Sequence, residues 1–170
     1  EAAEADLVAY SKNENLGGAG DDGSLITANI TAINDALAKA IQTRLENERL
    51  TEQIDAGKSG QLKQVLDSEA IQATRGKLTE LRASYQEKSS TFKPEFPEMR
   101  RLAAEIAEYE RQLQSEVDVI ANSIKIAYQT SIQEEVDLRR KLAELDAEQV
   151  AFRDKNIQYT ILKREVESYR

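Results

Sequence analysis

The sequence contains no cysteine, no histidine and no tryptophan. Without cysteine and histidine, the chain has no thiol nucleophile, no Cys/His zinc site and no histidine general base. Only two prolines and seven glycines occur among the 170 residues, and they are clustered, so most of the chain carries no helix breaker. No run of about 18 apolar residues is present, so the sequence predicts no membrane-spanning helix.

The residues that are abundant are those typical of long helices. Charged residues make up 32% of the chain and aromatic residues only 5%, and alanine, glutamate, leucine, lysine, arginine and glutamine dominate. The net charge is −8, with positive and negative residues alternating as on solvated helix faces. No basic stripe is present, so we expect no nucleic-acid partner. The net negative charge of the chain also disfavours direct binding to anionic lipid.

Apolar residues recur at helical spacing in two long segments. Ile26, Ile30, Ile33, Leu37 and Ile41 follow one another at steps of 4, 3, 4 and 4 residues. A second series runs from Leu102 through Ile132 to Leu145 with a mean step of about 3.6 residues, which is the period of a helix. The apolar seam expected between the two segments consists of Ile33, Leu37, Ile41, Leu78, Leu81, Leu102, Ile106, Leu113, Ile120, Leu138, Leu142 and Leu145.

A proline-flanked turn separates the two segments. Pro94, Phe96 and Pro97 lie in it, and the residue before each proline is pushed out of the helical region. Pro97 suits the first position of the following helix. Residues 25–91 and 98–164 are equal in length, and long helices joined by a short turn are antiparallel neighbours. The sequence therefore predicts an all-α fold: a long antiparallel coiled-coil helical hairpin with a short additional N-terminal helix.

Two glycine-containing stretches interrupt this pattern. The glycines and aspartates of residues 17–23 predict a flexible loop, with Ser24 as the N-cap of the next helix. A second break is expected near 57–66, opposite a less regular part of the second segment at 125–131. The expected organisation is an N-terminal helix over 1–16, the loop over 17–23, an ascending arm over 24–91, the turn over 92–97 and a descending helix over 98–170.

Three short motifs are better explained as ordinary structure than as ligand or catalytic sites. Gly57-Lys58-Ser59 lacks the glycine five positions earlier that a phosphate-binding loop requires, since Glu52 stands there. Asp21-Asp22-Gly23 lacks the remaining ligands of a calcium loop. Glu134-Glu135 is expected on a solvated face, where nothing raises a carboxyl pKa. We therefore expect no catalytic, cofactor-binding or metal site.

Four tyrosines could stack on sugars, but their helical spacing favours packing in the seam. They are Tyr85, Tyr109, Tyr128 and Tyr159.

Three stretches of the chain together carry a resemblance to one family of proteins. The first is Leu78-Thr79-Glu80-Leu81 to Tyr85, continuing through the turn Phe92–Met99 to Leu102, Ile106 and Leu113. The second is the C-terminal Leu162-Lys163-Arg164-Glu165-Val166, which is similar to the Leu-x-Arg-Glu-Val before the family's second transmembrane helix. The third is the opening Ala5, Leu7, Tyr10, Asn13 and Leu16. Together these stretches resemble bacterial polysaccharide co-polymerases, also called chain-length determinant or exopolysaccharide transport proteins. This family often has histidine where this chain has Phe96, and the Gly17–Gly23 loop has no counterpart.

The resemblance implies the periplasmic helical region of an inner-membrane protein that is not an enzyme in this region. Such proteins form homo-oligomeric rings that regulate the length and export of capsular or exopolysaccharide. The expected partners are the polysaccharide polymerase, an outer-membrane export channel and a cytoplasmic tyrosine kinase. Both ends read as helix interiors, so we expect flanking segments, including the membrane anchors, outside this sequence.

Within that interpretation, Arg164 and Glu165 are expected to form charge pairs between subunits or with a docked domain. Two other functions stay open at the level of sequence. One is the coiled-coil hairpin of a periplasmic membrane-fusion adaptor of an efflux or secretion pump. The other is a cytoplasmic coiled-coil scaffold.

Overall fold

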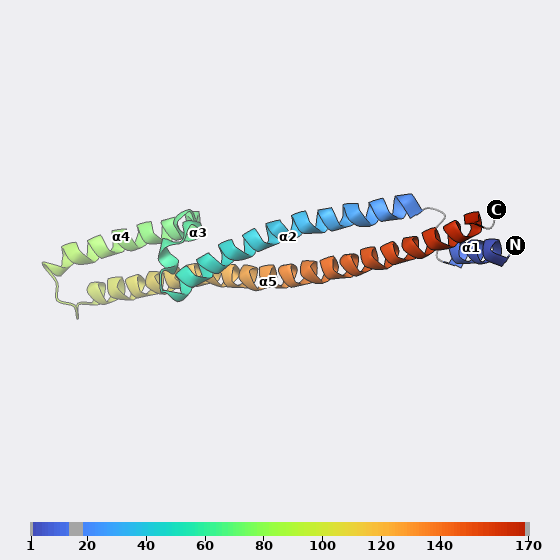
Figure 1. Cartoon of the computed structure of the whole chain (residues 1–170). Helices are drawn as coiled ribbons and strands as arrows, with labels where there is room; N and C mark the ends of the chain where they lie inside the picture. Colours follow the sequence, from blue (N-terminus) through green and yellow to red (C-terminus); the bar gives the residue numbers. More distant parts are fainter. Residues whose placement is uncertain (1, 14–18, 169–170) are drawn as a thin grey trace. The chain divides into compact units, whose positions relative to one another are not determined.

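The computed structural model describes residues 2–13 and 19–168, and in these ranges the chain is helical without any strand (Figure 1). The predicted all-α fold class is confirmed. The helices of the described residues are α1 (Ala2–Asn13), α2 (Ala19–Asp55), the short 3-10 helix η2 (Ser59–Gln61), α3 (Lys63–Leu66), α4 (Glu69–Ser89) and α5 (Pro97–Ser168).

The chain divides into two compact units, each described by itself. Unit 1 combines residues 1–42 with residues 132–170, and unit 2 comprises residues 43–131. Helices α2 and α5 each contribute to both units.

In unit 2, α4 lies beside the N-terminal part of α5 (Figure 1). The Thr74 hydroxyl donates to the Glu116 carboxylate at 3.0 Å, and Arg82 pairs with Glu110 at 2.7 Å. Residue numbers rise along α4 while those of the partners fall along α5, so these two helices run in opposite directions.

The turn between α4 and α5 is closed by backbone hydrogen bonds. The Phe92 N–H donates to the Lys88 carbonyl at 2.9 Å, and the Phe96 carbonyl accepts from the Arg100 N–H at 3.0 Å. Helix α5 begins at Pro97, where the missing N–H costs nothing because no intrahelical acceptor exists there. The rings of Phe92 and Phe96 stack with centroids 4.5 Å apart.

The core of unit 2 lies at the break in the ascending arm. Leu62 and Val65 are fully buried there and share one cluster with Ile71 of α4 and with Val117 and Ile124 of α5. The break is therefore a packed element, in which Leu62 and Val65 belong to the same buried cluster as residues of α5.

The break also shifts the pairing of the two arms. Asp55 pairs with Lys125 at 2.9 Å, and Thr74 bonds to Glu116. Nineteen residues separate Asp55 from Thr74, but only nine separate Lys125 from Glu116. The extra residues of the ascending arm are taken up in the break, which is why it packs on α5 before the expected 125–131 region. Helix α5 continues through that region without interruption.

Unit 1 joins α1, the first part of α2 and the last part of α5. The Tyr10 hydroxyl donates to the Lys155 carbonyl at 3.5 Å, and the Gln149 side chain donates to the Thr27 hydroxyl at 3.4 Å. Ile26 of α2 is buried in this unit at 7% exposure.

The start of α2 differs from the expected loop. The helix begins at Ala19, so residues 19–23 are helical and Ser24 lies inside the helix instead of capping it. The rest of the expected loop lies outside the described residues. Gly23 packs so closely on the Phe152 ring that an added Cβ would lie 2.7 Å from it. The glycine that predicted a loop therefore permits a close helix contact.

The twelve residues expected in the seam are all buried or half-buried. The second segment departs from its expected pattern at one place, where Ile132 is 38% exposed and the preceding Ser131 is 1% exposed. The Ser131 hydroxyl donates to the Tyr128 carbonyl at 2.7 Å, so its burial leaves no unsatisfied donor.

Candidate functional site

The C-terminal motif lies on the last turns of α5 in unit 1. Leu162 and Val166 are half-buried, whereas Arg164 and Glu165 are exposed. A spacing of four residues places Leu162 and Val166 on the same helix face. The motif therefore combines an inward apolar pair with an outward pair of opposite charges.

A hollow lies beside this motif, between the start of α2 and α5. It has a volume of about 490 Å³, and Gly23 and Thr27 form its α2 side. On α5 it is lined by Phe152, Ile157 and Ile161, and the two isoleucines are 51% and 47% exposed. An apolar surface of this kind is suited to contact with another apolar surface.

Two arginines flank the apolar floor of the hollow. Arg153 and Arg164 both line it, and no carboxylate does. They are separated by eleven residues, which is about 16 Å along a helix. Neither arginine forms an ion pair with another residue of the described part of the chain. In a chain with a net charge of −8, this face can attract an acidic partner.

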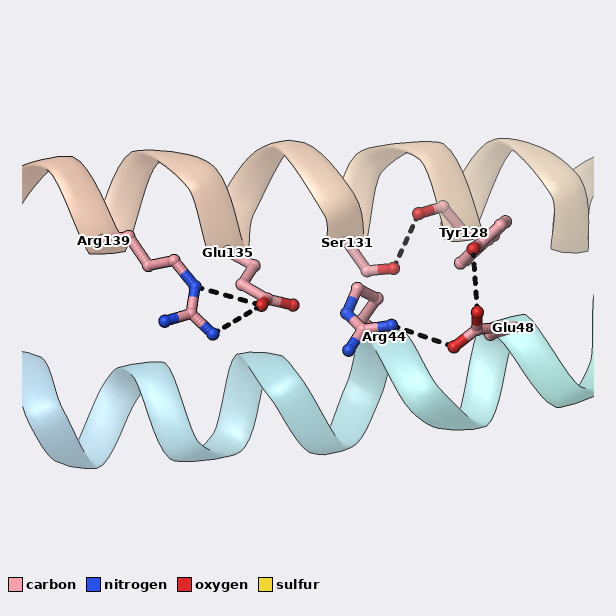
Figure 2. A network of polar contacts seen from close by, with 6 residues as sticks. All are labelled: Arg44, Glu48, Tyr128, Ser131, Glu135 and Arg139. Carbon is pink, nitrogen blue, oxygen red and sulfur yellow. Dashed lines mark hydrogen bonds and ion pairs between the residues drawn. The ribbon is translucent and has the colours of Figure 1, made fainter.

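A layer of polar side chains interrupts the apolar seam in unit 2 (Figure 2). Arg44 pairs with Glu48 at 2.9 Å, and the Tyr128 hydroxyl donates to the same carboxylate at 3.4 Å. Burial, followed by the nearby Glu48 carboxylate, raises the pKa of Tyr128. Because these polar groups satisfy one another, the layer favours one register of α2 on α5 over shifted alternatives.

A second ion pair lies on the unit 1 side of α5 (Figure 2). The Arg139 guanidinium donates twice to one Glu135 oxygen, at 2.9 and 3.1 Å. The Glu135 side chain is only 13% exposed, so the expectation of a solvated carboxylate is wrong for Glu135, whereas Glu134 is exposed as expected. The Arg139 guanidinium neutralises the Glu135 carboxylate in this half-buried position.

The other sequence motifs do not form ligand sites in the described structure. The N–H groups of Gly57 and Lys58 donate to the carbonyls of Ile54 and Gln53, so they cannot cradle a phosphate. Gly57 has a φ of 75°, which suits glycine at the end of α2. Within the described ranges, no three His, Cys, Asp or Glu side chains are grouped to hold a metal.

The remaining aromatic residues divide between packing and the turn. Tyr85, Tyr109, Tyr128 and Tyr159 are all half-buried. Phe96 is 44% exposed at the turn. Among the helices described, none combines the length and apolar character that a membrane crossing requires.

The sequence motif includes Arg164, whose role stays a prediction, whereas the α2 side of this region was not predicted. The glycines of residues 17–23 predicted a loop, so the sequence indicated no helix face there. A helix face there could have been recognised from the acidic Asp22 and the apolar Leu25, which are three residues apart, as neighbours on one helix face are.

Comparison with models of protein families, with curated proteins and with solved structures finds no match to this chain.

Proposed function

We propose that this chain is the periplasmic helical region of a bacterial inner-membrane polysaccharide co-polymerase, which regulates the length and export of capsular or exopolysaccharide. The observation that carries the proposal concerns α5. The proline-flanked turn and the Leu162–Val166 motif, which bear much of the resemblance, lie at the two ends of this one helix of 72 residues.

We propose further that the chain forms an antiparallel coiled-coil hairpin that acts as a stiff spacer. Within each unit, residue numbers rise along one helix while those of its contact partners fall along α5, and this order supports an antiparallel architecture. In unit 2, Thr74 and Arg82 bond to Glu116 and Glu110. In unit 1, Thr27 bonds to Gln149, and Gly23 lies against Phe152.

In this proposal the chain performs no covalent chemistry. Its exposed faces hold copies of the membrane protein together, and the assembly acts with the polymerase, an outer-membrane export channel and a cytoplasmic tyrosine kinase. Arg164 and Glu165 stand exposed at the end of α5, where they are available for contacts outside the described chain.

Deletion of the gene in its bacterium, followed by complementation, tests the proposal. We expect the deletion to abolish long polymer or to change its length distribution on a gel, and the full-length gene to restore it. Arg164→Ala should restore it incompletely. Arg111→Ala is the matched control, because Arg111 is also exposed on α5 but pairs within its own helix with Glu108.

Two other results would point to the alternatives. Unchanged polymer together with increased sensitivity to toxic compounds would indicate a pump adaptor. Unchanged polymer with the protein recovered in the cytoplasmic fraction would indicate a scaffold, and either result would overturn the proposal.

A further inference from the structure

One exposed face of α5 in unit 1 has an ordered arrangement of charge and apolar surface. From Arg153 the residues on this face are Ile157, Thr160, Ile161 and Arg164, at steps of 4, 3, 1 and 3. Such steps keep all five on one side of a helix. The face therefore has a positive charge at each end and two half-exposed isoleucines between them.

One exposed face of α2 has the complementary arrangement. Asp22, Leu25, Ala28, Ala32 and Asp35 follow at steps of 3, 3, 4 and 3, and all are exposed. Leu25 is 60% exposed. A shallow hollow beside it is lined by Asp22, Ser24, Leu25 and Ala28. This face has a negative charge at each end, with one leucine and two small residues between them.

The two faces match when the helices run in opposite directions. Asp22 is three residues from Leu25, just as Arg164 is three residues from Ile161. Placing Leu25 on Ile161 sets Asp22 beside Arg164. The spans between the terminal charges are thirteen residues on α2 and eleven on α5, a difference of about 3 Å that a flexible arginine side chain can bridge.

The four charges that would meet are available for such a contact. Asp22, Asp35, Arg153 and Arg164 form no ion pair with other residues in the described ranges. Alanine at positions 28 and 32 leaves room for Ile157 to approach the α2 backbone.

We propose that the Arg153–Arg164 face of α5 binds the Asp22–Asp35 face of α2 in a second copy of this chain. The contact uses two different surfaces, so each copy binds one neighbour through α5 and another through α2. The inference rests on the proposed function in one respect: copies anchored in one membrane run in the same direction. Helix α2 of one copy then runs opposite to α5 of its neighbour, as the match requires.

Cysteine cross-linking in cells that express the full-length protein tests this pairing directly, because the described chain has no native cysteine. One tagged copy carries Leu25→Cys, and a second copy with a different tag carries Ile161→Cys. Oxidation should give a disulfide-linked pair containing both tags. The control replaces Ile161→Cys by Val119→Cys, which is 66% exposed on unit 2 and should give no product.

Charge reversal tests the ends of the interface. Arg164→Glu in the Ile161→Cys copy should lower the yield of the linked pair about tenfold, since an attractive contact becomes repulsive. Adding Asp22→Lys to the Leu25→Cys copy should restore the yield. Retained helicity by circular dichroism shows that these exposed substitutions leave the fold intact.

Two results would overturn the inference. One is a yield for the Leu25–Ile161 pair no higher than for the control pair. The other is linkage of Leu25→Cys only to itself, which would indicate a symmetric interface. Specific linkage, together with unchanged polymer length after deletion of the gene, would instead sustain this interface and refute the proposed function.

Discussion

Leu62 and Leu66 provide a direct test of the packed break in unit 2. They lie four residues apart, Leu62 as the N-cap of the short helix α3 and Leu66 as its last residue. Leu62 is 0% exposed and belongs to the core cluster, whereas Leu66 is 48% exposed. Truncation of each to alanine removes the same atoms from two different environments.

The structure gives different magnitudes for the two substitutions. Leu62→Ala should lower the free energy of unfolding by about 3 kcal/mol, because it removes a fully buried side chain and leaves a cavity against Val65 and Ile124. Leu66→Ala should lower the free energy of unfolding by about 1 kcal/mol or less, because about half of the Leu66 side chain is already in water and because alanine favours the helix.

Urea titration followed by circular dichroism at 222 nm measures both values. The slope of unfolding free energy against urea should be the same for the two variants, so that the midpoints can be compared. A cost for Leu66→Ala equal to that for Leu62→Ala would refute the reasoning. Such a result would mean that the break is not anchored by the buried residues of this cluster.

Further substitutions test other elements of the two units. Gly76→Ala should stabilise the protein by about 0.5–1 kcal/mol in the same titration, because no atom lies within 4 Å of the added Cβ in α4. Gly23→Ala should stabilise the protein less than Gly76→Ala does, or should destabilise it, because the added Cβ meets the Phe152 ring. An equal increase in unfolding free energy at both glycines would contradict that close contact. The hydrogen bond and charge of Lys88 lower the pKa of Glu98 below 4.5, so the ion pair contributes stability above that pH and loses it as the pH falls through the lowered pKa. The stability difference between the wild type and Glu98→Gln should therefore shrink on titration from pH 7 to pH 3, and a difference independent of pH would argue against the pair.

Several features of the fold could be predicted from local sequence alone. Pro97 begins a helix because a residue without an N–H and with a fixed φ suits that position in any context. Leu102 and Leu145 are buried because the spacing of apolar residues places them on one face. For the candidate site, local sequence identified Arg164 but gave no indication of its surroundings.

Other features depend on what a residue contacts. Gly23 has the same sequence signal in a loop and in a helix, and only the Phe152 ring against it distinguishes the two. The α2 face that carries Asp22 and Leu25 was missed for this reason. The local sequence likewise showed a break near 57–66, but it could not show that Leu62 would be fully buried.

The sequence by itself determined that the chain is helical, where α5 begins and that the twelve seam residues face inward, because backbone preference and apolar period are local properties. The tertiary structure alone decided how the break packs, how far it shifts the pairing of α4 on α5, and that residues 19–23 extend α2. These depend on contacts between residues far apart in the chain, such as Gly23 with Phe152 and Thr74 with Glu116. No local pattern encodes the partner in such a contact.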